Sequence, residues 1–260
     1  MRRVRRGLAS SVAALVLLLA LLGVGVLGWA VGLLCGVVLA HAAARRAAVD
    51  RVETFGPADL VTLTRATLAC VVAGLVAESF GGADVAHRMV PLTVVALGLD
   101  FVDGRVARRT GTASAYGGRL DGEADAFLIL VLSVFVARDH GAWVLGLGLV
   151  RYGYAFAERL VPWMQRPLPP RHWRKTVAAY VGISLTLAAS GAAPAAVTYA
   201  GLVIGALLLA ESFGSDVGWL WRRRSEVNRT GAADVSSGQV LERNRLERNR
   251  LERNRLERNR

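Results

Sequence analysis

Long apolar stretches recur from near the N-terminus to about residue 213, and they constrain the fold more than any other feature of the sequence. An α-helix rises about 1.5 Å per residue, so roughly 20 apolar residues cross the ~30 Å hydrocarbon core of a membrane. Hydrophobic residues make up 53% of the chain and charged residues only 20%, which is typical of proteins that cross a membrane several times. The sequence therefore predicts an all-α, polytopic membrane helix bundle.

The first apolar stretch, residues 7–44, is too long for one membrane crossing. A glycine-rich segment at 23–28 lies near its middle, where a turn would divide it into two short spans. A single span would also place one of two arginine clusters, at 2–6 or 45–51, outside the cell, against the preference of basic residues for the cytoplasm. We therefore expect a helical hairpin with both of its ends in the cytoplasm.

Six further apolar stretches predict six more membrane-spanning helices. Their expected bounds are 58–79, 88–108, 118–137, 142–161, 174–190 and 194–213. With the N-terminus inside, the arginine-rich connections between alternate spans all lie in the cytoplasm, which agrees with the positive-inside rule. The expected location is the cell membrane.

The chain is expected to have three parts. They are an N-terminal hairpin with a cytoplasmic link, a six-span core, and a polar, disordered cytoplasmic tail, at residues 1–54, 55–215 and 216–260. The tail ends in four copies of LERNR, whose leucines step about 140° around a helix and form no single apolar stripe. The net charge of +12 is spread over the connections and the tail, which favours contact with anionic lipids, and we expect no binding of nucleic acid.

Four aspartates interrupt the apolar pattern at the edge of two expected helices. Asp100 and Asp103 are three residues apart, and Asp121 and Asp125 are four apart, so each pair lies on one face of its helix. The short link at 109–117 makes the two helices antiparallel and brings the pairs together. Each ionised acid near membrane depth costs about 3 kcal/mol, and mutual repulsion adds to this cost. Four converging carboxylates therefore need a compensating cation.

Carboxylate oxygens without nearby His or Cys favour a hard divalent cation. We expect Mg²⁺ or Mn²⁺, with two ions bridged by the carboxylates. Gly104, Ala107 and Gly117 leave room for a ligand close to the backbone, and Arg108 offers a planar donor for phosphate or a nucleotide. The alternative is that the acids only cap helix ends and the small residues only allow helices to pack closely. This explanation is adequate for any one of these residues, but it does not account well for all of them together.

The same residues form a known motif. The pattern resembles the signature of the CDP-alcohol phosphotransferase (CDP-alcohol phosphatidyltransferase) family at all eight fixed positions, Asp100-x-x-Asp103-Gly104-x-x-Ala107-Arg108, eight residues, Gly117-x-x-x-Asp121-x-x-x-Asp125. The resemblance covers about 55 to 213 and includes GPADLVTLTRATLA, which is similar to the start of the family's first core helix. Thr62 and Arg65 match there, and Asp59 stands where Asn is usual.

The resemblance implies transfer of the phosphatidyl group from CDP-diacylglycerol to a polar alcohol, with release of CMP, at the cytoplasmic face. It implies that the metal ligands are Asp100, Asp103, Asp121 and Asp125, and that Asp125 is also the catalytic general base. The positions implied to bind CDP are Gly104, Ala107, Arg108, Gly117, Asp59, Thr62 and Arg65. The expected partners are CDP-diacylglycerol, a small polar alcohol, membrane lipids and, as one option, a second copy of the chain.

Basic residues after the motif predict a pocket for the acceptor alcohol. Arg151 lies near the middle of its expected span, where an unpaired arginine costs about 3 kcal/mol, so it needs an acid partner such as Glu158 or a motif aspartate, a bound anion, or a route to water. The expected acceptor-binding residues are Arg151, Arg159, Arg174 and Lys175. Three of them resemble basic positions of phosphatidylglycerophosphate synthases, although Tyr152 stands where those enzymes tend to carry an acid. Glycerol 3-phosphate is one expected acceptor, and inositol phosphate or another alcohol is the alternative.

Two other classes of protein use similar features. A transporter also places acids within the membrane, but it needs a route across the whole bilayer, whereas these acids gather at one edge. A non-catalytic membrane scaffold would be expected to lose some motif positions, whereas every position is present here. Both remain alternatives to an enzyme.

Overall fold

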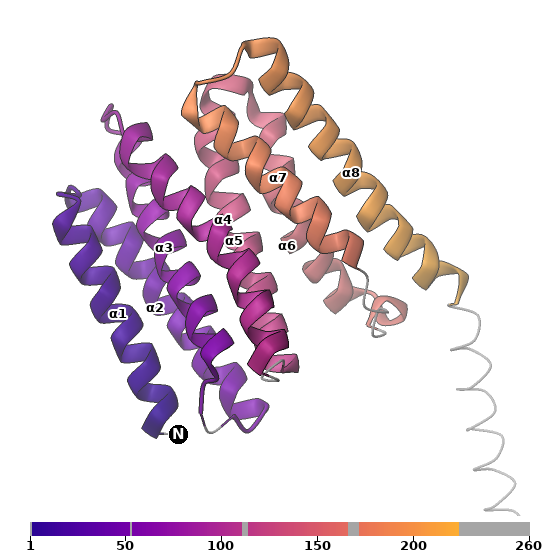
Figure 1. Cartoon of the computed structure of the whole chain (residues 1–260). Coiled ribbons are helices and arrows are strands. Elements are labelled where there is room, and N and C mark those ends of the chain that lie inside the picture. Colours follow the sequence, from indigo (N-terminus) through magenta and orange to yellow (C-terminus); the bar gives the residue numbers. More distant parts are fainter. Residues whose placement is uncertain (1, 53, 111–113, 166–171, 224–260) are drawn as a thin grey trace, which may run out of the picture. The chain divides into compact units, whose positions relative to one another are not determined.

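The computed structural model describes residues 2–52, 54–110, 114–165 and 172–223, and at 2, 3, 5, 103–110, 115 and 172 it describes the backbone alone. These residues form α-helices joined by short links and two short 3₁₀ helices, without a strand (Figure 1). The α-helices are α1 (Arg2–Leu21), α2 (Val26–Val49), α3 (Pro57–Ser79), α4 (Ala86–Thr110), α5 (Ala115–His140), α6 (Leu145–Leu160), α7 (His172–Ser190) and α8 (Ala195–Arg222). The predicted all-α bundle is confirmed.

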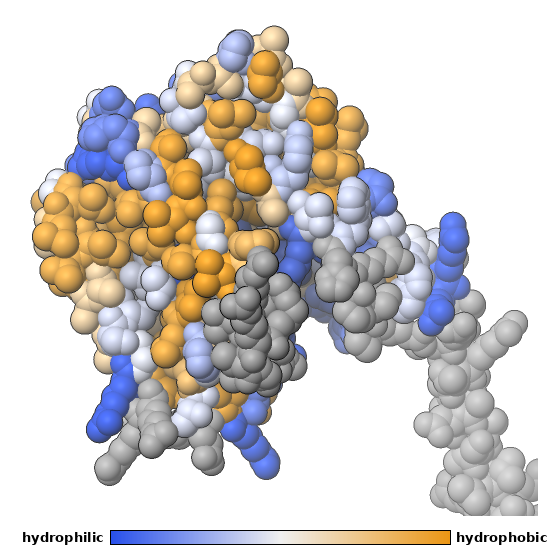
Figure 2. Space-filling model, viewed as in Figure 1, coloured by the Kyte–Doolittle hydropathy of each residue, from blue (hydrophilic) through white to orange (hydrophobic). Residues whose placement is uncertain are grey.

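The helices coincide with the predicted apolar stretches, and α8 continues beyond the predicted end at 213. Within the described residues α2, α3 and α8 are long and apolar enough to cross a membrane, and α1 contains a shorter apolar segment, Arg6–Leu21. Large apolar side chains of α1 and α2, such as Leu17 and Leu34, are exposed, as lipid-facing residues are. Figure 2 shows hydrophobic residues on the visible face at the level of the middle of α1 and α2. The number of membrane crossings stays a prediction.

The predicted N-terminal hairpin is present. It turns at Gly23, whose φ of +59° lies in the left-handed region that glycine adopts without strain. The returning helix α2 meets α3 at two further glycines: a Cβ atom on Gly28 would lie 2.8 Å from the carbonyl oxygen of Gly74, and one on Gly74 would lie 2.7 Å from that of Gly28. Two helix backbones approach this closely only where both residues lack a side chain. The glycine pair therefore fixes the hairpin against the core.

Helix α3 is the centre of the larger of two compact units. This unit comprises Met1–Tyr154 and Pro170–Ser212, and the smaller one comprises Ala155–Pro169 and Phe213–Arg260. Helix α3 packs against α1, α2, α4 and α5, and α7 packs against α4 and α5. In the most apolar window of α3, 78% of the residues are buried, compared with 22% in α2. Side chains near the start of α3 therefore lie where α4 and α5 can reach them, and α7 packs against both of these helices.

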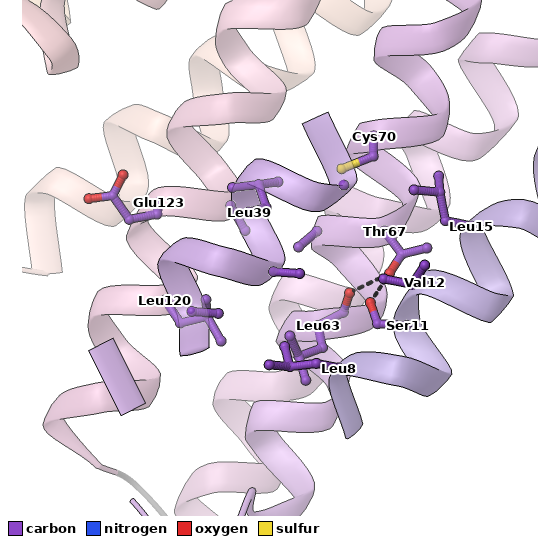
Figure 3. Close-up of a pocket in the computed structure, with 15 residues that line it drawn as sticks. Leu8, Ser11, Val12, Leu15, Leu39, Leu63, Thr67, Cys70, Leu120 and Glu123 are labelled. Carbon is purple, nitrogen blue, oxygen red and sulfur yellow. Dashed lines mark hydrogen bonds between the residues drawn. The ribbon is translucent and has the colours of Figure 1, made fainter. Parts of the chain in front are cut away.

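A pocket between the hairpin and the core is lined by residues of α1, α2, α3 and α5 (Figure 3). Its walls are largely leucine, valine and alanine side chains. Two polar groups in it satisfy each other, because the hydroxyl oxygens of Ser11 and Thr67 lie 2.5 Å apart in a hydrogen bond. None of Asp100, Asp121 and Asp125 lines this pocket, so these aspartates lie outside it.

Candidate active site

Three of the motif aspartates meet in the structure. Asp100 lies on α4, and Asp121 and Asp125 lie one turn apart on α5. One carboxylate oxygen from each lies within 4.8 Å of the other two. Asp121 is buried, and Asp100 and Asp125 are half-buried. The predicted convergence is therefore observed for these three, whereas the side chain of Asp103 lies outside the described residues.

The guanidinium group of Arg65 lies among the three carboxylates. Arg65 comes from α3, and its side chain is only 2% exposed. It forms ion pairs with Asp121 and Asp125, and its Nη1 lies 3.0 Å from Oδ1 of Asp100. Its Nε donates a hydrogen bond of 3.2 Å to the carbonyl oxygen of Ala96 on α4. Arg65 therefore joins α3 to both helices that carry the acids.

This contact of Arg65 with the acids is not among the features predicted from the sequence. There, the predicted compensating cation is a metal ion and the predicted role of Arg65 is CDP binding. A signal was present, because Arg65 is the one basic residue of α3 and lies in its apolar part. An arginine in such a stretch needs an acid partner, which is the argument already applied to Arg151.

Lys175 is a second cation at the cluster. It lies on α7 and its Nζ donates a hydrogen bond of 2.7 Å to Oδ2 of Asp121. The side chain of Lys175 is 64% exposed, whereas that of Asp121 is 7% exposed. Lys175 therefore reaches a buried carboxylate from an open position, where a dissolved anion can also reach it.

The other predicted acceptor residues differ in how the structure places them. Nη2 of Arg151 lies 3.8 Å from Oε1 of Glu123 on α5, so its observed acid partner is neither Glu158 nor a motif aspartate. Arg174 is half-buried beside Lys175 on α7. Arg159 belongs to the smaller unit. The roles of these residues in acceptor binding stay predictions.

Besides Arg65, the predicted CDP-binding residues Asp59 and Thr62 are also buried near the start of α3. Oδ2 of Asp59 accepts a hydrogen bond of 2.8 Å from the backbone N–H of Gly56 and so caps the helix. A Cβ atom on Gly117 would lie 2.6 Å from Oδ1 of Asp59, so a side chain at 117 would push this carboxylate away. Thr62 donates a hydrogen bond of 3.2 Å to the carbonyl oxygen of Ala58. At the remaining positions, Gly104, Ala107 and Arg108, the structure describes the backbone alone.

A cleft opens beside the acid cluster. It is lined by residues of α4, α5 and α7, namely Leu97, Asp100, Asp125, Leu128, Ile129, Ala178 and Ala179. Apart from the two aspartates, this lining is apolar. In this cleft two carboxylates therefore lie next to an apolar surface of the kind that packs against hydrocarbon chains.

The residues present fit a hard divalent cation. Three carboxylates supply oxygen ligands, which Mg²⁺ and Mn²⁺ prefer. Oδ1 of Asp100 is shielded from solvent, and the contact described for it is the ion pair with Nη1 of Arg65 at 3.0 Å, which does not have hydrogen-bond geometry. A buried carboxylate oxygen of this kind is satisfied by a bound cation. The cluster can therefore hold a metal ion.

Comparison with known proteins gives one match. A family model described as CDP-alcohol phosphatidyltransferase matches residues 56–210, which contain every motif position named above. No curated protein and no solved structure matches the chain. The family match supports a transferase of phospholipid synthesis that acts in a membrane, whereas the resemblance to phosphatidylglycerophosphate synthases is not among these findings. Because the matched segment covers more than half of the chain and includes the whole acid cluster, the protein belongs to the CDP-alcohol phosphatidyltransferase family.

Proposed function

We propose that this protein transfers the phosphatidyl group of CDP-diacylglycerol to the hydroxyl group of a small polar alcohol and releases CMP. The observation that carries the proposal is the convergence of Asp100, Asp121 and Asp125 beside a cleft with otherwise apolar walls. A substrate with a charged diphosphate and two acyl chains needs polar and apolar surfaces next to each other. Family membership supports the same reaction class.

The reaction consists of one displacement at phosphorus. The acceptor oxygen forms a bond to the phosphorus that carries diacylglycerol, and the bond from this phosphorus to the bridging oxygen of CMP breaks. CMP leaves with the bonding electrons, and the hydroxyl proton passes to the general base, Asp125. Asp125 suits this role because it lines the cleft, whereas the neighbouring Asp121 is buried and bonded to Lys175.

Asp100, Asp121 and Asp125, together with Asp103, would hold two Mg²⁺ or Mn²⁺ ions. When bound, such ions neutralise the charge on the reacting phosphates. The predicted CDP contacts at Asp59, Thr62, Arg65, Gly104, Ala107, Arg108 and Gly117 would hold the leaving nucleotide. Two observations support this placement: Arg65 contacts the three acids, and Gly117 at the start of α5 lies against Asp59 at the start of α3.

The acceptor is proposed to carry a phosphate group, with glycerol 3-phosphate as the first candidate. Lys175 and Arg151 support this choice, because both are partly exposed cations that contact acids on α5, at Asp121 and Glu123. An arriving phosphate can replace these acids as their partner. The site is proposed to face the cytoplasm, where water-soluble acceptors and CMP are present, and the arginine-rich connections support this orientation.

An assay of CMP release tests the proposal. The purified chain in lipid nanodiscs would receive CDP-diacylglycerol, Mg²⁺ or Mn²⁺, and one acceptor at a time from glycerol 3-phosphate, glycerol, inositol phosphate, inositol and serine. We expect CMP and a new phospholipid in equal amounts, only with an acceptor and a divalent ion. A folded protein that releases no CMP with any of these acceptors would contradict the enzyme proposal and favour a scaffold or transporter.

A further inference from the structure

Arg65 is buried and its guanidinium group contacts groups of the protein itself, which its predicted role in CDP binding does not explain. Its side chain is 2% exposed, and its guanidinium group contacts Asp100, Asp121 and Asp125 while Nε is bonded to the carbonyl oxygen of Ala96. Burying a charged group costs several kcal/mol unless opposite charges and hydrogen bonds compensate. The position of Arg65 therefore depends on the acid cluster, and the cluster depends on Arg65.

The formal charges support this mutual dependence. The three described carboxylates carry three negative charges, and among the residues whose side chains the structure describes, Arg65 and Lys175 are the cations in contact with them. Lys175 contacts one carboxylate and is 64% exposed, so water already screens it. Arg65 contacts all three and is shielded from water, so it supplies most of the compensation.

We infer that Arg65 is the internal counter-cation of the acid cluster: it holds the aspartates of α4 and α5 together in the metal-free protein and competes with a divalent cation for the same carboxylates. The inference rests on the proposed metal site and goes beyond the proposed CDP-binding role of Arg65. It assigns Arg65 a positioning role, because Arg65 acts through the aspartates.

The inference predicts two effects of opposite sign. Without the charge of Arg65, the three carboxylates repel one another, so the metal-free protein becomes less stable. The same loss of positive charge makes the cluster more attractive to a divalent cation, so metal binds more tightly. An arginine that only filled space would lower stability without tightening metal binding, and one that only bound CDP would change neither.

The test uses the full chain in nanodiscs, freed of metal with a chelator that is then removed. The melting temperature is measured without metal, and binding of Mn²⁺ alone is measured by calorimetry and by loss of the free Mn²⁺ electron paramagnetic resonance signal. In Arg65→Gln we expect a lower melting temperature without metal and a dissociation constant for Mn²⁺ at least about tenfold smaller. Arg65→Lys keeps the charge and should fall between the two.

Arg138→Gln is the matched control. Arg138 lies on α5 and donates a hydrogen bond of 2.6 Å to Oγ of Ser79, at the other end of α3. Its loss should lower the melting temperature but leave the affinity for Mn²⁺ unchanged, because Arg138 contacts none of the three acids.

Unchanged or weaker Mn²⁺ binding by Arg65→Gln would overturn the inference and leave the metal site standing. Absence of Mn²⁺ binding in the wild type would overturn the proposed metal site and the inference with it. If Arg65→Gln does not fold, the double variant Arg65→Gln, Asp125→Asn decides, because it removes one charge of each sign. Its failure to recover stability would also overturn the inference.

Discussion

The ammonium group of Lys175 lies 2.7 Å from Oδ2 of Asp121 and joins α7 to the acid cluster. The two partners differ in exposure, since the Lys175 side chain is 64% exposed and that of Asp121 is 7% exposed. An ion pair with one end in water adds little stability, because water screens it. Lys175 can therefore exchange Asp121 for a phosphate group at small cost.

Replacing Lys175 with Ala is expected to weaken binding of a phosphorylated acceptor. The loss of one charge-assisted hydrogen bond, about 2 kcal/mol, corresponds to a roughly thirtyfold higher KM for glycerol 3-phosphate. The KM for CDP-diacylglycerol should change much less. Steady-state kinetics with each substrate varied in turn measure both values.

Lys175→Arg is the matched control, since it keeps the charge and should retain most of the acceptor affinity. Arg151→Ala should produce a similar acceptor defect if Arg151 also binds the phosphate. Equal use of inositol or serine by the wild type, with no acceptor defect in either alanine variant, would rule out the phosphate pocket.

Replacing Asp125 with Asn is expected to abolish transfer while the protein stays folded in the membrane. The amide keeps an oxygen in place but cannot accept the hydroxyl proton, and loss of a general base lowers kcat by about 100- to 10,000-fold. Turnover of CDP-diacylglycerol and the melting temperature are measured on the same preparation. Asp139→Asn, an exposed position near the other end of α5, is the control and should keep normal turnover. Near-normal turnover of Asp125→Asn would exclude Asp125 as the base.

Replacing Gly74 with Ala is expected to separate the hairpin from the core. The new methyl group would lie 2.7 Å from the carbonyl oxygen of Gly28, so the helices must move apart, at a cost of about 1–3 kcal/mol. Thermal unfolding in nanodiscs measures this loss. Gly98→Ala is the control, because a Cβ atom there would meet nothing within 4 Å, and it should leave the melting temperature unchanged or slightly raised. Equal melting temperatures for the two variants would show that the glycine crossing is not needed.

The hydropathy pattern predicted the helices because each helix needs about 20 apolar residues to cross a membrane. It does not predict how far a helix continues beyond its membrane span: the last span is predicted to end at 213, and α8 continues to Arg222. Hydropathy counts Ser212 and Asp216 as polar and therefore as a boundary, but both side chains are buried in the structure. Burial of polar groups depends on their partners in space, which a local average does not contain.

In the candidate site, too, relations within one helix could be predicted from the sequence, whereas contacts between different helices could not. The spacing of Asp121 and Asp125 predicted that they share a helix face, because that relation depends on helix geometry alone. The contact of Arg65 with the acids depends on how α3 packs against α4 and α5, and the partner of Arg151 depends on the position of Glu123. These contacts join residues far apart in the sequence, so spacing could not predict them.

The orientation in the membrane gives the last prediction. The eight predicted spans and the arginine-rich connections predict that Arg6, Gln165 and Arg222 face the cytoplasm and that Asp84 and Ala192 face the outside. All five residues are exposed, so a cysteine at each can react with a membrane-impermeant maleimide. The background is a variant without Cys35 and Cys70, which are the two cysteines of the chain.

We expect Asp84→Cys and Ala192→Cys to react in intact cells, and Arg6→Cys, Gln165→Cys and Arg222→Cys to react only after the membrane is opened. Labelling after solubilisation in detergent controls for reactivity, because it shows that each cysteine is accessible once the membrane is removed. Reaction of Arg6→Cys in intact cells would reverse the orientation of the hairpin. Since α3 follows the hairpin directly, it would also place the acid cluster on the outer side, away from the cytoplasmic pools of acceptor and CMP.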